Sequence, residues 1–306
     1  MIKKIPLPLA GVMLGCAALG NLLQSYSEIA RIVCGVIAGI LLVLLLLKLI
    51  LHPGMVKDDL KTPILAGVAA TFPMALMLLS VYVKPVIGDV AFYLWLFAIA
   101  LHIVLMVYFT LRFVVHFDLK NVFTVWFIVY VGIAVAGVSA PAYGRTADIG
   151  TISFWFGLVS CAILLVVVAL RYAKLPVPDP AKPLIGIFTA PVSLCIAAYV
   201  QSVTPKNITF LLVMFGLASA LYLFALIAVI KQMFTLPFFP SYAGWTFPFV
   251  ISAIAAKQTA ACAEKLGHPL TFMQPIIIAE TIIATVLVAY VLVRFLVFLT
   301  KKEATK

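Results

Sequence analysis

The stretches Thr71-Phe72-Pro73, Thr189-Ala190-Pro191 and Thr246-Phe247-Pro248 decide the fold, because each places a proline inside a long apolar run. A proline within a helix removes one backbone hydrogen bond and displaces the carbonyl group four residues earlier. In hydrocarbon the freed groups have no water to bind, so a broken helix belongs where protein or a water-filled cavity surrounds it. If the apolar runs are membrane spans, the repeated pattern predicts a set of inner helices.

The composition of the chain is that of a membrane protein. Of its 306 residues, 65% are hydrophobic and 10% are charged, and the mean hydropathy is +1.24. Soluble domains carry about 25% charged residues, and a soluble core of this length has no room for so much apolar surface. We therefore expect an all-α membrane protein, and we interpret the formal charge of +11 as a topology signal rather than a sign of nucleic-acid binding.

The apolar runs predict about ten transmembrane helices in a single domain over residues 1–306. A bilayer core of about 30 Å requires roughly 20 apolar residues per helix. The runs that qualify are about 6–23, 28–51, 62–83, 88–113, 122–142, 150–172, 183–203, 207–233, 243–263 and 272–299. The connections are short, so consecutive helices are expected to be antiparallel and to form five helical hairpins.

Basic residues are distributed unevenly between the two ends of these spans. One side carries 15 of the 21: Lys3, Lys4, Lys48, Lys57, Lys61, Arg112, Lys120, Arg171, Lys174, Lys182, Lys231, Arg294, Lys301, Lys302 and Lys306. The other side carries Arg31, Lys84, Arg145, Lys206, Lys257 and Lys265. Because Lys and Arg accumulate in cytoplasmic loops, both termini are expected in the cytoplasm, with the chain in a bacterial cytoplasmic (inner) membrane.

The spans alternate in composition along the chain. Odd-numbered spans carry prolines and small residues, whereas even-numbered spans are mainly large and aliphatic, as at residues 41–47 and 164–170. We interpret the odd spans as an inner ring around a pore and the even spans as an outer ring against lipid. Close packing of helices through small residues is the competing explanation for any single stripe.

The predicted pore lining consists of small, polar or proline residues in the odd spans: Gly11, Gly15, Pro73, Thr189, Pro191, Ser193, Pro248, Ser252, Ala253 and Ala256. In the ninth span, Ser252, Ala253 and Ala256 follow Phe249 by three, four and seven residues, a spacing that puts them on one helix face.

The sequence contains no motif of an intramembrane enzyme, metal site or cofactor site. No catalytic residue and no cofactor is therefore expected. Ionisable residues inside spans are functional candidates. Lys257 is predicted either to attract anions at the pore mouth or to extend its amine to the interface, whereas His102 and Glu280 are interpreted mainly as partners in interhelical hydrogen bonds.

Three short motifs resemble a known family. They are Ile5-Pro6-Leu7-Pro8 followed by Gly11-Val12-Met13-Leu14-Gly15, then Ala190-Pro191-Val192-Ser193-Leu194-Cys195, and Trp245-Thr246-Phe247-Pro248-Phe249. In order and placement they resemble the tellurite-resistance/dicarboxylate transporter family, which is related to the slow anion channels of plant guard cells. The similarity covers essentially the whole chain.

The resemblance implies a homotrimer in which every subunit has its own pore. Five inner helices would surround that pore, and a phenylalanine of the ninth helix would block it midway. The matching residue is taken as Phe249, facing Gly11 of the first helix. Two departures are Met13 and Val129, which stand near positions where the family usually has proline.

The resemblance and the missing catalytic motifs together favour transport. The leading hypothesis is a channel or uniporter-like carrier for small anions, C4-dicarboxylates such as malate among them, with a phenylalanine gate. The alternatives are a proton-coupled anion or sulfite exporter on the same scaffold, and a membrane scaffold or sensor that transports nothing.

Overall fold

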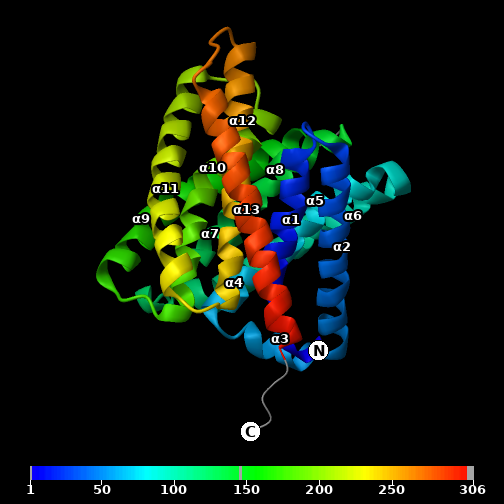
Figure 1. Cartoon of the computed structure of the whole chain (residues 1–306), viewed down its shortest axis with the longest axis vertical. Coiled ribbons are helices and arrows are strands. Elements are labelled where there is room, and N and C mark those ends of the chain that lie inside the picture. The colour runs from blue at the N-terminus through cyan, green and yellow to red at the C-terminus, as the bar shows by residue number, and fades with distance from the viewer. Residues whose placement is uncertain (1, 145–146, 302–306) are drawn as a thin grey trace.

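The computed structural model describes residues 2–144 and 147–301, and within these all regular secondary structure is helical, without a β-strand (Figure 1). The basic residues Arg145, Lys302 and Lys306, which entered the topology prediction, lie outside the described residues. Both ends of the described chain lie at the same end of the molecule, as expected for an even number of spans.

Eight helical segments of the described chain are long and apolar enough to cross a membrane. They are α2 (Glu28–Leu51), α4 with α5 (Pro63–Ala69 and Thr71–Ile87), α6 with η2 (Val90–Phe109 and Thr110–Val114), α7 to η5 (Val125–Tyr130, Val131–Ala134, Val135–Ser139 and Ala140–Tyr143), α9 (Ala147–Lys174), η6 with α10 (Asp179–Thr189 and Ala190–Ser202), α11 (Ile208–Thr235) and α13 (Met273–Thr300).

The first and ninth predicted spans correspond to two further helices that are not among these eight. The first, α1 (Leu9–Leu23), is apolar but has only 15 residues. The ninth consists of η7 (Pro240–Trp245) and α12 (Phe247–Lys265), and the C-terminal half of α12 is polar, with Lys257, Gln258 and Glu264. The remaining short helices are η1 (Ile2–Lys4), α3 (Pro53–Asp59) and η3 (Leu119–Asn121).

The three prolines of the repeated pattern stand near the beginnings of α-helices, which corrects the expectation that they bend helices in the middle. Pro191 and Pro248 lie in the first turns of α10 and α12, directly after the 3₁₀-helices η6 and η7, and Pro73 is the third residue of α5, after the break at Ala70. The first N–H groups of a helix have no partner within it, so a proline there removes no hydrogen bond. Each of these spans is thus a short segment followed by a new α-helix.

The fifth span is broken without a proline near its centre. The α-helix α7 ends at Tyr130, and a 3₁₀ turn, η4, separates it from α8. His102 of α6 meets this break, because its Nε2 lies 2.9 Å from the carbonyl oxygen of Val129. Gly132 leaves no room for a side chain, since a Cβ there would lie 2.7 Å from Sδ of Met74. His102 therefore has the interhelical hydrogen bond expected of it.

Burial divides the spans into two groups. We compared the buried share of an 18-residue apolar stretch in each segment. It is 78%, 72% and 89% for Pro63–Ile87, Val125–Tyr143 and Asp179–Ser202, against 22% to 33% for the other five segments. The five exposed segments carry the large apolar side chains that face outward, in keeping with contact to lipid. Nearly every residue of α1 is buried, and so is nearly every residue of α12 from Phe247 to Ala256.

The buried helices pack on one another in the centre of the molecule. The helix α1 contacts α2, α5, α12 and α13, and α10 contacts α8, α9, α11 and α12. In Figure 1, α10 and α12 run side by side in the middle of the view, α13 passes in front of α12, and α2 and α11 lie toward the two sides. The first turns of α5, α10 and α12 are consequently inside the molecule, where the candidate site lies.

Candidate functional site

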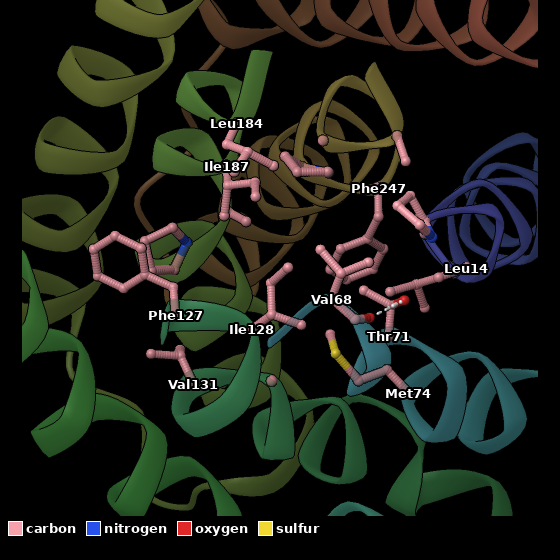
Figure 2. Close-up of a pocket in the computed structure, with 18 of the residues that line it drawn as sticks. Leu14, Val68, Thr71, Met74, Phe127, Ile128, Val131, Leu184, Ile187 and Phe247 are labelled. Carbon is pink, nitrogen blue, oxygen red and sulfur yellow. Dashed lines mark hydrogen bonds between the residues drawn. The ribbon is translucent and has the colours of Figure 1, made fainter. Parts of the chain in front are cut away.

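A small apolar cavity lies where the broken spans meet (Figure 2). Its volume is about 40 Å³, room for a few water molecules at most. The residues that line it come from α1, α4, α5, α7, η4, η6, α10, η7 and α12, with Pro8 just before α1: Pro8, Gly11, Leu14, Val68, Thr71, Met74, Phe127, Ile128, Val131, Gly132, Leu184, Ile187, Ala190, Pro191, Leu194, Ser241, Ala243, Gly244, Phe247 and Pro248. We call it the central cavity.

The hydroxyl groups of the central cavity are already engaged. Oγ1 of Thr71 donates to the carbonyl oxygen of Val68 at 2.7 Å, and Oγ of Ser241 donates to that of Pro180 at 2.5 Å. The lining contains no charged residue. A hydrated ion that entered this cavity would lose much of its water shell.

Two larger cavities continue the central one in opposite directions. One, of about 370 Å³, shares Pro8, Val68, Leu184 and Ser241 with it and is bordered by Pro63 and Pro178. The other, of about 330 Å³, shares Leu194 and Phe247 with it and is bordered by Asn21, Arg31 and Gln258. We call them the terminal and the distal cavity, after their positions relative to the chain termini. The three form a series that is wide at both ends and narrow in the middle.

Phe247 and Leu194 separate the central from the distal cavity. Phe247 is the first residue of α12, and Figure 2 shows its side chain pointing into the central cavity, toward the side lined by Val68 and Met74. On α12 the lining continues through Ile251, Ile254 and Gln258 of the distal cavity, a spacing that follows one helix face.

Phe249, the predicted gate, lies on the opposite side of α12. It is fully buried, its ring centroid is 5.3 Å from that of Tyr222 on α11, and it borders none of the three cavities. Successive helix residues are separated by about 100°, so two positions in sequence turn a side chain by about 200°. Gly11 does line the central cavity, but it faces Ala243 of η7, whose Cβ would be 3.2 Å from an added Cβ.

The other predicted pore residues fall into two sets. Pro191 and Pro248, like Gly11, line the central cavity. Gly15, Pro73 and Thr189 are buried but border none of the three cavities. Gly15 instead packs directly on Thr246, where an added Cβ would lie 2.5 Å from the threonine Cβ.

The small residues of α12 form a helix-packing face. Oγ of Ser252 lies 3.1 Å from Oγ of Ser193 and donates to the carbonyl oxygen of Thr189 at 3.2 Å, which joins α12 to α10. Ala256 packs with Met273 and Ile277 of α13, and Ala253 is fully buried. Ser193, Ser252, Ala253 and Ala256 therefore do not border the cavity series; the packing explanation holds for this stripe.

Helix N-termini gather around the central cavity. Its lining includes Thr71, Ala190 and Phe247, the first residues of α5, α10 and α12, together with Pro8, which precedes α1. A helix N-terminus carries about half a positive elementary charge. The N-terminal ends of three helices therefore lie at a cavity without a charged side chain, next to the C-terminal ends of α4, η6 and η7, which stop at the same breaks.

The distal cavity is polar where the central one is apolar. Its lining includes Asn21, Gln24, Arg31, Gln201 and Gln258. Lys257 is not part of that lining: its Nζ donates to Oγ of Ser25 and lies 4.9 Å from the centre of the Tyr26 ring. The basic side chain at this end of the series is Arg31, which the sequence analysis counted only as a topology charge.

Glu280 occupies a separate buried cluster. It borders a pocket of about 10 Å³ together with Ser193, Ser219, Tyr222 and Ser252, between α10, α11, α12 and α13. Within the described residues, no group of three or more His, Cys, Asp or Glu side chains is arranged to hold a metal ion.

The sequence matches the family described as voltage-dependent anion channel (SLAC1) over residues 4–296. The match covers nearly the whole chain, so the protein belongs to this family, a family of anion channels and transporters rather than enzymes. The family resemblance expected from the three motifs is confirmed. A comparison with curated proteins gave no match.

Two residues of the site escaped the sequence analysis. Phe247 lies in the same motif as Phe249, and the signal for it is the spacing of Phe247, Ile251, Ile254 and Gln258 along one helix face. Arg31 carried no such signal, because its neighbours in the distal cavity come from distant parts of the chain.

Proposed function

We propose that each subunit conducts small anions through its own three cavities, C4-dicarboxylates such as malate among the candidate substrates. One observation carries this proposal: residues of α1, the third, fifth and seventh spans, and α12 line both the central and the distal cavity, so the cavities follow one another along a single path. No chemical step is required. The ion loses part of its hydration in the middle and regains it at either end.

The arrangement we propose is an inner ring of five segments and an outer ring of five. The inner ring consists of α1, the three broken spans listed above as mostly buried, and η7 with α12. The outer ring consists of the five mostly exposed segments. The difference in burial supports this assignment. Pairing each inner segment with the outer one that follows it gives the five expected hairpins.

The helix N-termini at the central cavity supply the selectivity for anions. An anion there interacts favourably with the positive ends of α5, α10 and α12, whereas a cation is repelled. Because the lining is otherwise apolar, this field is weakly screened. The narrow centre can therefore favour anions without holding one tightly, which conduction requires.

Phe247 is the gate of the path. An apolar constriction can close a pore by excluding water, and Phe247 with Leu194 forms the boundary between the central and distal cavities. This assignment replaces Phe249 by the phenylalanine two positions earlier in the same motif.

Anion flux through purified protein in liposomes tests the proposal. A panel of chloride, nitrate, sulfite and malate is to be measured with the native chain, Phe247→Ala and Phe249→Ala. Phe247→Ala is expected to raise anion flux severalfold. Phe249→Ala is the matched control: it removes a buried ring, lowers the thermal unfolding midpoint and leaves the flux per folded protein unchanged.

Two results would contradict the proposal. Absence of flux for every anion, in both the native protein and Phe247→Ala, would exclude an anion pathway and leave the scaffold or sensor alternative. A rise in flux for Phe249→Ala, with Phe247→Ala unchanged, would return the gate to Phe249.

A proton-coupled exporter, for sulfite or another anion, is the second candidate, and Glu280 supports it. This buried carboxyl group has one oxygen, Oε2, without a hydrogen-bond partner in the described structure, and the nearby hydroxyl of Tyr222 also has none. Protonation of Glu280 would remove a negative charge next to α12, the helix that carries Phe247. The coupled mechanism requires that a pH gradient drive anion flux and that Glu280→Gln abolish that dependence.

The assembly and location that we propose follow the family. The chain forms a homotrimer with one pathway per subunit, inserted in the bacterial cytoplasmic membrane with both termini in the cytoplasm. The uneven distribution of Lys and Arg between the two ends of the spans supports the orientation. The mass of the intact complex in native mass spectrometry tests the trimer.

A further inference from the structure

We propose that Arg31 and the carboxamides of the distal cavity form a recognition site for planar oxyanions, such as nitrate or a carboxylate, at the entrance to the constriction. The site rests on the proposed function, since it gives the anion pathway a selective entrance. It lies at the end of the molecule away from the termini, next to Phe247.

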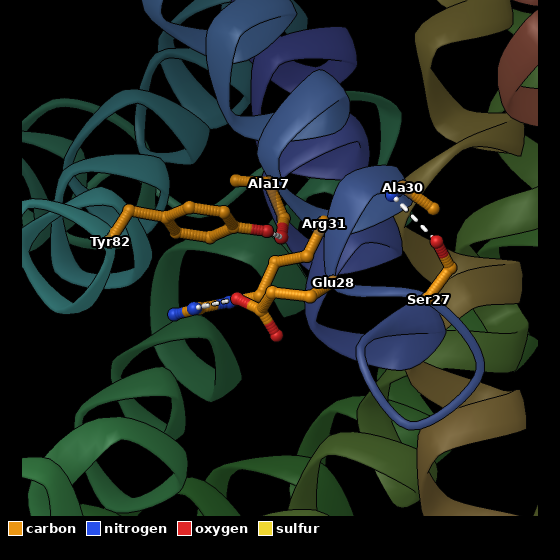
Figure 3. Close-up of polar contacts among 6 residues, drawn as sticks. All are labelled: Ala17, Ser27, Glu28, Ala30, Arg31 and Tyr82. Carbon is orange, nitrogen blue, oxygen red and sulfur yellow. Dashed lines mark hydrogen bonds and ion pairs between the residues drawn. The ribbon is translucent and has the colours of Figure 1, made fainter.

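The position of Arg31 is fixed by a tyrosine held between two helices (Figure 3). The hydroxyl group of Tyr82, on α5, donates to the carbonyl oxygen of Ala17 on α1 at 2.7 Å. Gly20 and Gly35 make room for the tyrosine, because a Cβ added at either one would lie 2.2 or 2.7 Å from its side chain. The guanidinium of Arg31 stands 4.7 Å from the centre of the Tyr82 ring, a cation–π distance.

A carboxylate already occupies one edge of the guanidinium. NH1 of Arg31 donates to Oε1 of Glu28 at 2.8 Å, one helical turn earlier on α2. Ser27 begins this helix by accepting a hydrogen bond from the N–H of Ala30, which sets Glu28 in the first turn. The Glu28 side chain is 55% exposed, against 15% for Arg31, so the acid can move into solvent while the arginine stays in place.

The guanidinium has donor capacity left for a ligand. Its Nε is buried and makes no hydrogen bond in the described structure. A buried N–H without a partner is costly, so a small rotation of the guanidinium that brings Nε to an anion in the distal cavity would relieve that cost. The Glu28 carboxylate then competes with a bound anion for the guanidinium of Arg31.

The rest of the distal cavity suits an anion with several acceptor atoms. Asn21 and Gln24 come from α1, Gln201 from α10 and Gln258 from α12, and each carboxamide carries two N–H donors. Arg31 is the one charged residue among the lining side chains. The volume of about 330 Å³ leaves space for the ion and part of its hydration shell.

This chemistry distinguishes a planar oxyanion from a halide. The fork of a guanidinium matches the two oxygens of a carboxylate or nitrate and binds them with paired hydrogen bonds, whereas a lysine amine acts as a point charge. Chloride gains the charge but not the paired geometry. The site therefore favours nitrate and carboxylates over chloride.

Measurements of nitrate and chloride with three variants test the site. Half-saturating concentrations and the nitrate-to-chloride permeability ratio are to be measured on reconstituted protein at constant ionic strength. Arg31→Gln is expected to raise the half-saturating nitrate concentration about tenfold, the effect of losing a hydrogen bond to a charged group. Arg31→Lys keeps the charge and loses most of the preference for nitrate, and Glu28→Gln strengthens nitrate binding.

Lys257→Gln is the matched control. It removes one positive charge from the same end of the molecule, but Lys257 does not line the distal cavity. Its nitrate preference and half-saturation should equal those of the native chain. If it behaves like Arg31→Gln, a general surface field explains both effects and the site is excluded; if Arg31→Lys keeps the native preference, the recognition by geometry is wrong.

A binding measurement separates failure of the site from failure of the function. In detergent, nitrate replacing chloride should raise the thermal unfolding midpoint of the native protein but not of Arg31→Lys. This stabilisation requires no flux, so it can succeed where conduction fails. A native protein that conducts anions, with the same midpoint in nitrate and chloride, would refute the site alone.

Discussion

At the scale of single residues, Phe247 and Phe249 are two positions apart in the sequence but have entirely different surroundings. Both belong to the motif that relates the chain to its family, yet Phe247 borders two cavities and Phe249 packs against Tyr222. The motif alone identifies this part of the chain, but not which of its side chains points into the cavities. That direction depends on the residue at which α12 begins. It begins at Phe247, after the 3₁₀-helix η7.

Gly15 is the residue on which the contact between α1 and α12 depends. Gly15→Ala should lower the stability of the protein by about 1–3 kcal/mol, the usual cost of overpacking. The reason is that its Cβ would lie 2.5 Å from that of Thr246, whose Oγ1 donates to the carbonyl oxygen of Gly11 at 3.0 Å. Thermal unfolding in detergent measures the effect.

Gly39→Ala provides the control for Gly15→Ala. Gly39 lies in α2, and an added Cβ there has no atom within 4 Å. This change should leave the unfolding midpoint unchanged or raise it slightly, since alanine favours a helix over glycine by about 1 kcal/mol. Equal midpoints for the two variants would show that Gly15 is not tightly packed.

At the scale of helices, the broken spans differ from what their prolines suggest. Pro191 and Pro248 lie in the first turns of α10 and α12, where they favour the start of a helix rather than a bend. The fifth span breaks at η4 without such a proline, next to His102 and Gly132. Tertiary contacts therefore decide where these spans break, and proline is one of several ways to allow it.

Pro191→Ala should be tolerated for this reason. At the second position of α10 the proline replaces an N–H that has no intrahelical partner, so its loss should cost at most about 1 kcal/mol. Anion flux in liposomes should stay near the native level. Ala197→Pro, in the interior of the same helix, is the contrasting variant and should cost about 3 kcal/mol or more. Equal losses of flux in both would mean that Pro191 shapes the path by bending α10.

At the scale of the whole molecule, the outer surface and the inner path have opposite compositions. Exposed leucine, isoleucine, valine and phenylalanine side chains cover α2, α6, α9, α11 and α13, while the path has a polar distal end and an apolar centre. The outer surface is therefore suited to contact with lipid, and the distal cavity is suited to contact with water. The apolar outer surface accounts for the high hydrophobic content from which the membrane class was expected.

Cysteine labelling tests the orientation of the chain. The described native cysteines are buried or, in Cys34, half-buried, so they give little background. Lys57→Cys in α3 and His268→Cys in the loop after α12 introduce exposed thiols at opposite ends of the molecule. With both termini in the cytoplasm, a membrane-impermeant maleimide should label His268→Cys in intact cells and Lys57→Cys only after lysis. The reverse pattern would invert the proposed topology.

The sequence by itself determined the membrane class, the all-helical fold and the family, because each depends on local properties: run length, hydropathy and short motifs. It also separated the spans into two compositions, which the burial of the helices follows. Only the tertiary structure decided which side chains share a cavity. Phe247 rather than Phe249 borders the cavities because the break after η7 sets the rotation of α12. Arg31 borders the distal cavity, where it lies against the Tyr82 ring. Both positions depend on contacts such as Gly15 with Thr246 and Tyr82 with Gly35, which join residues far apart in the chain.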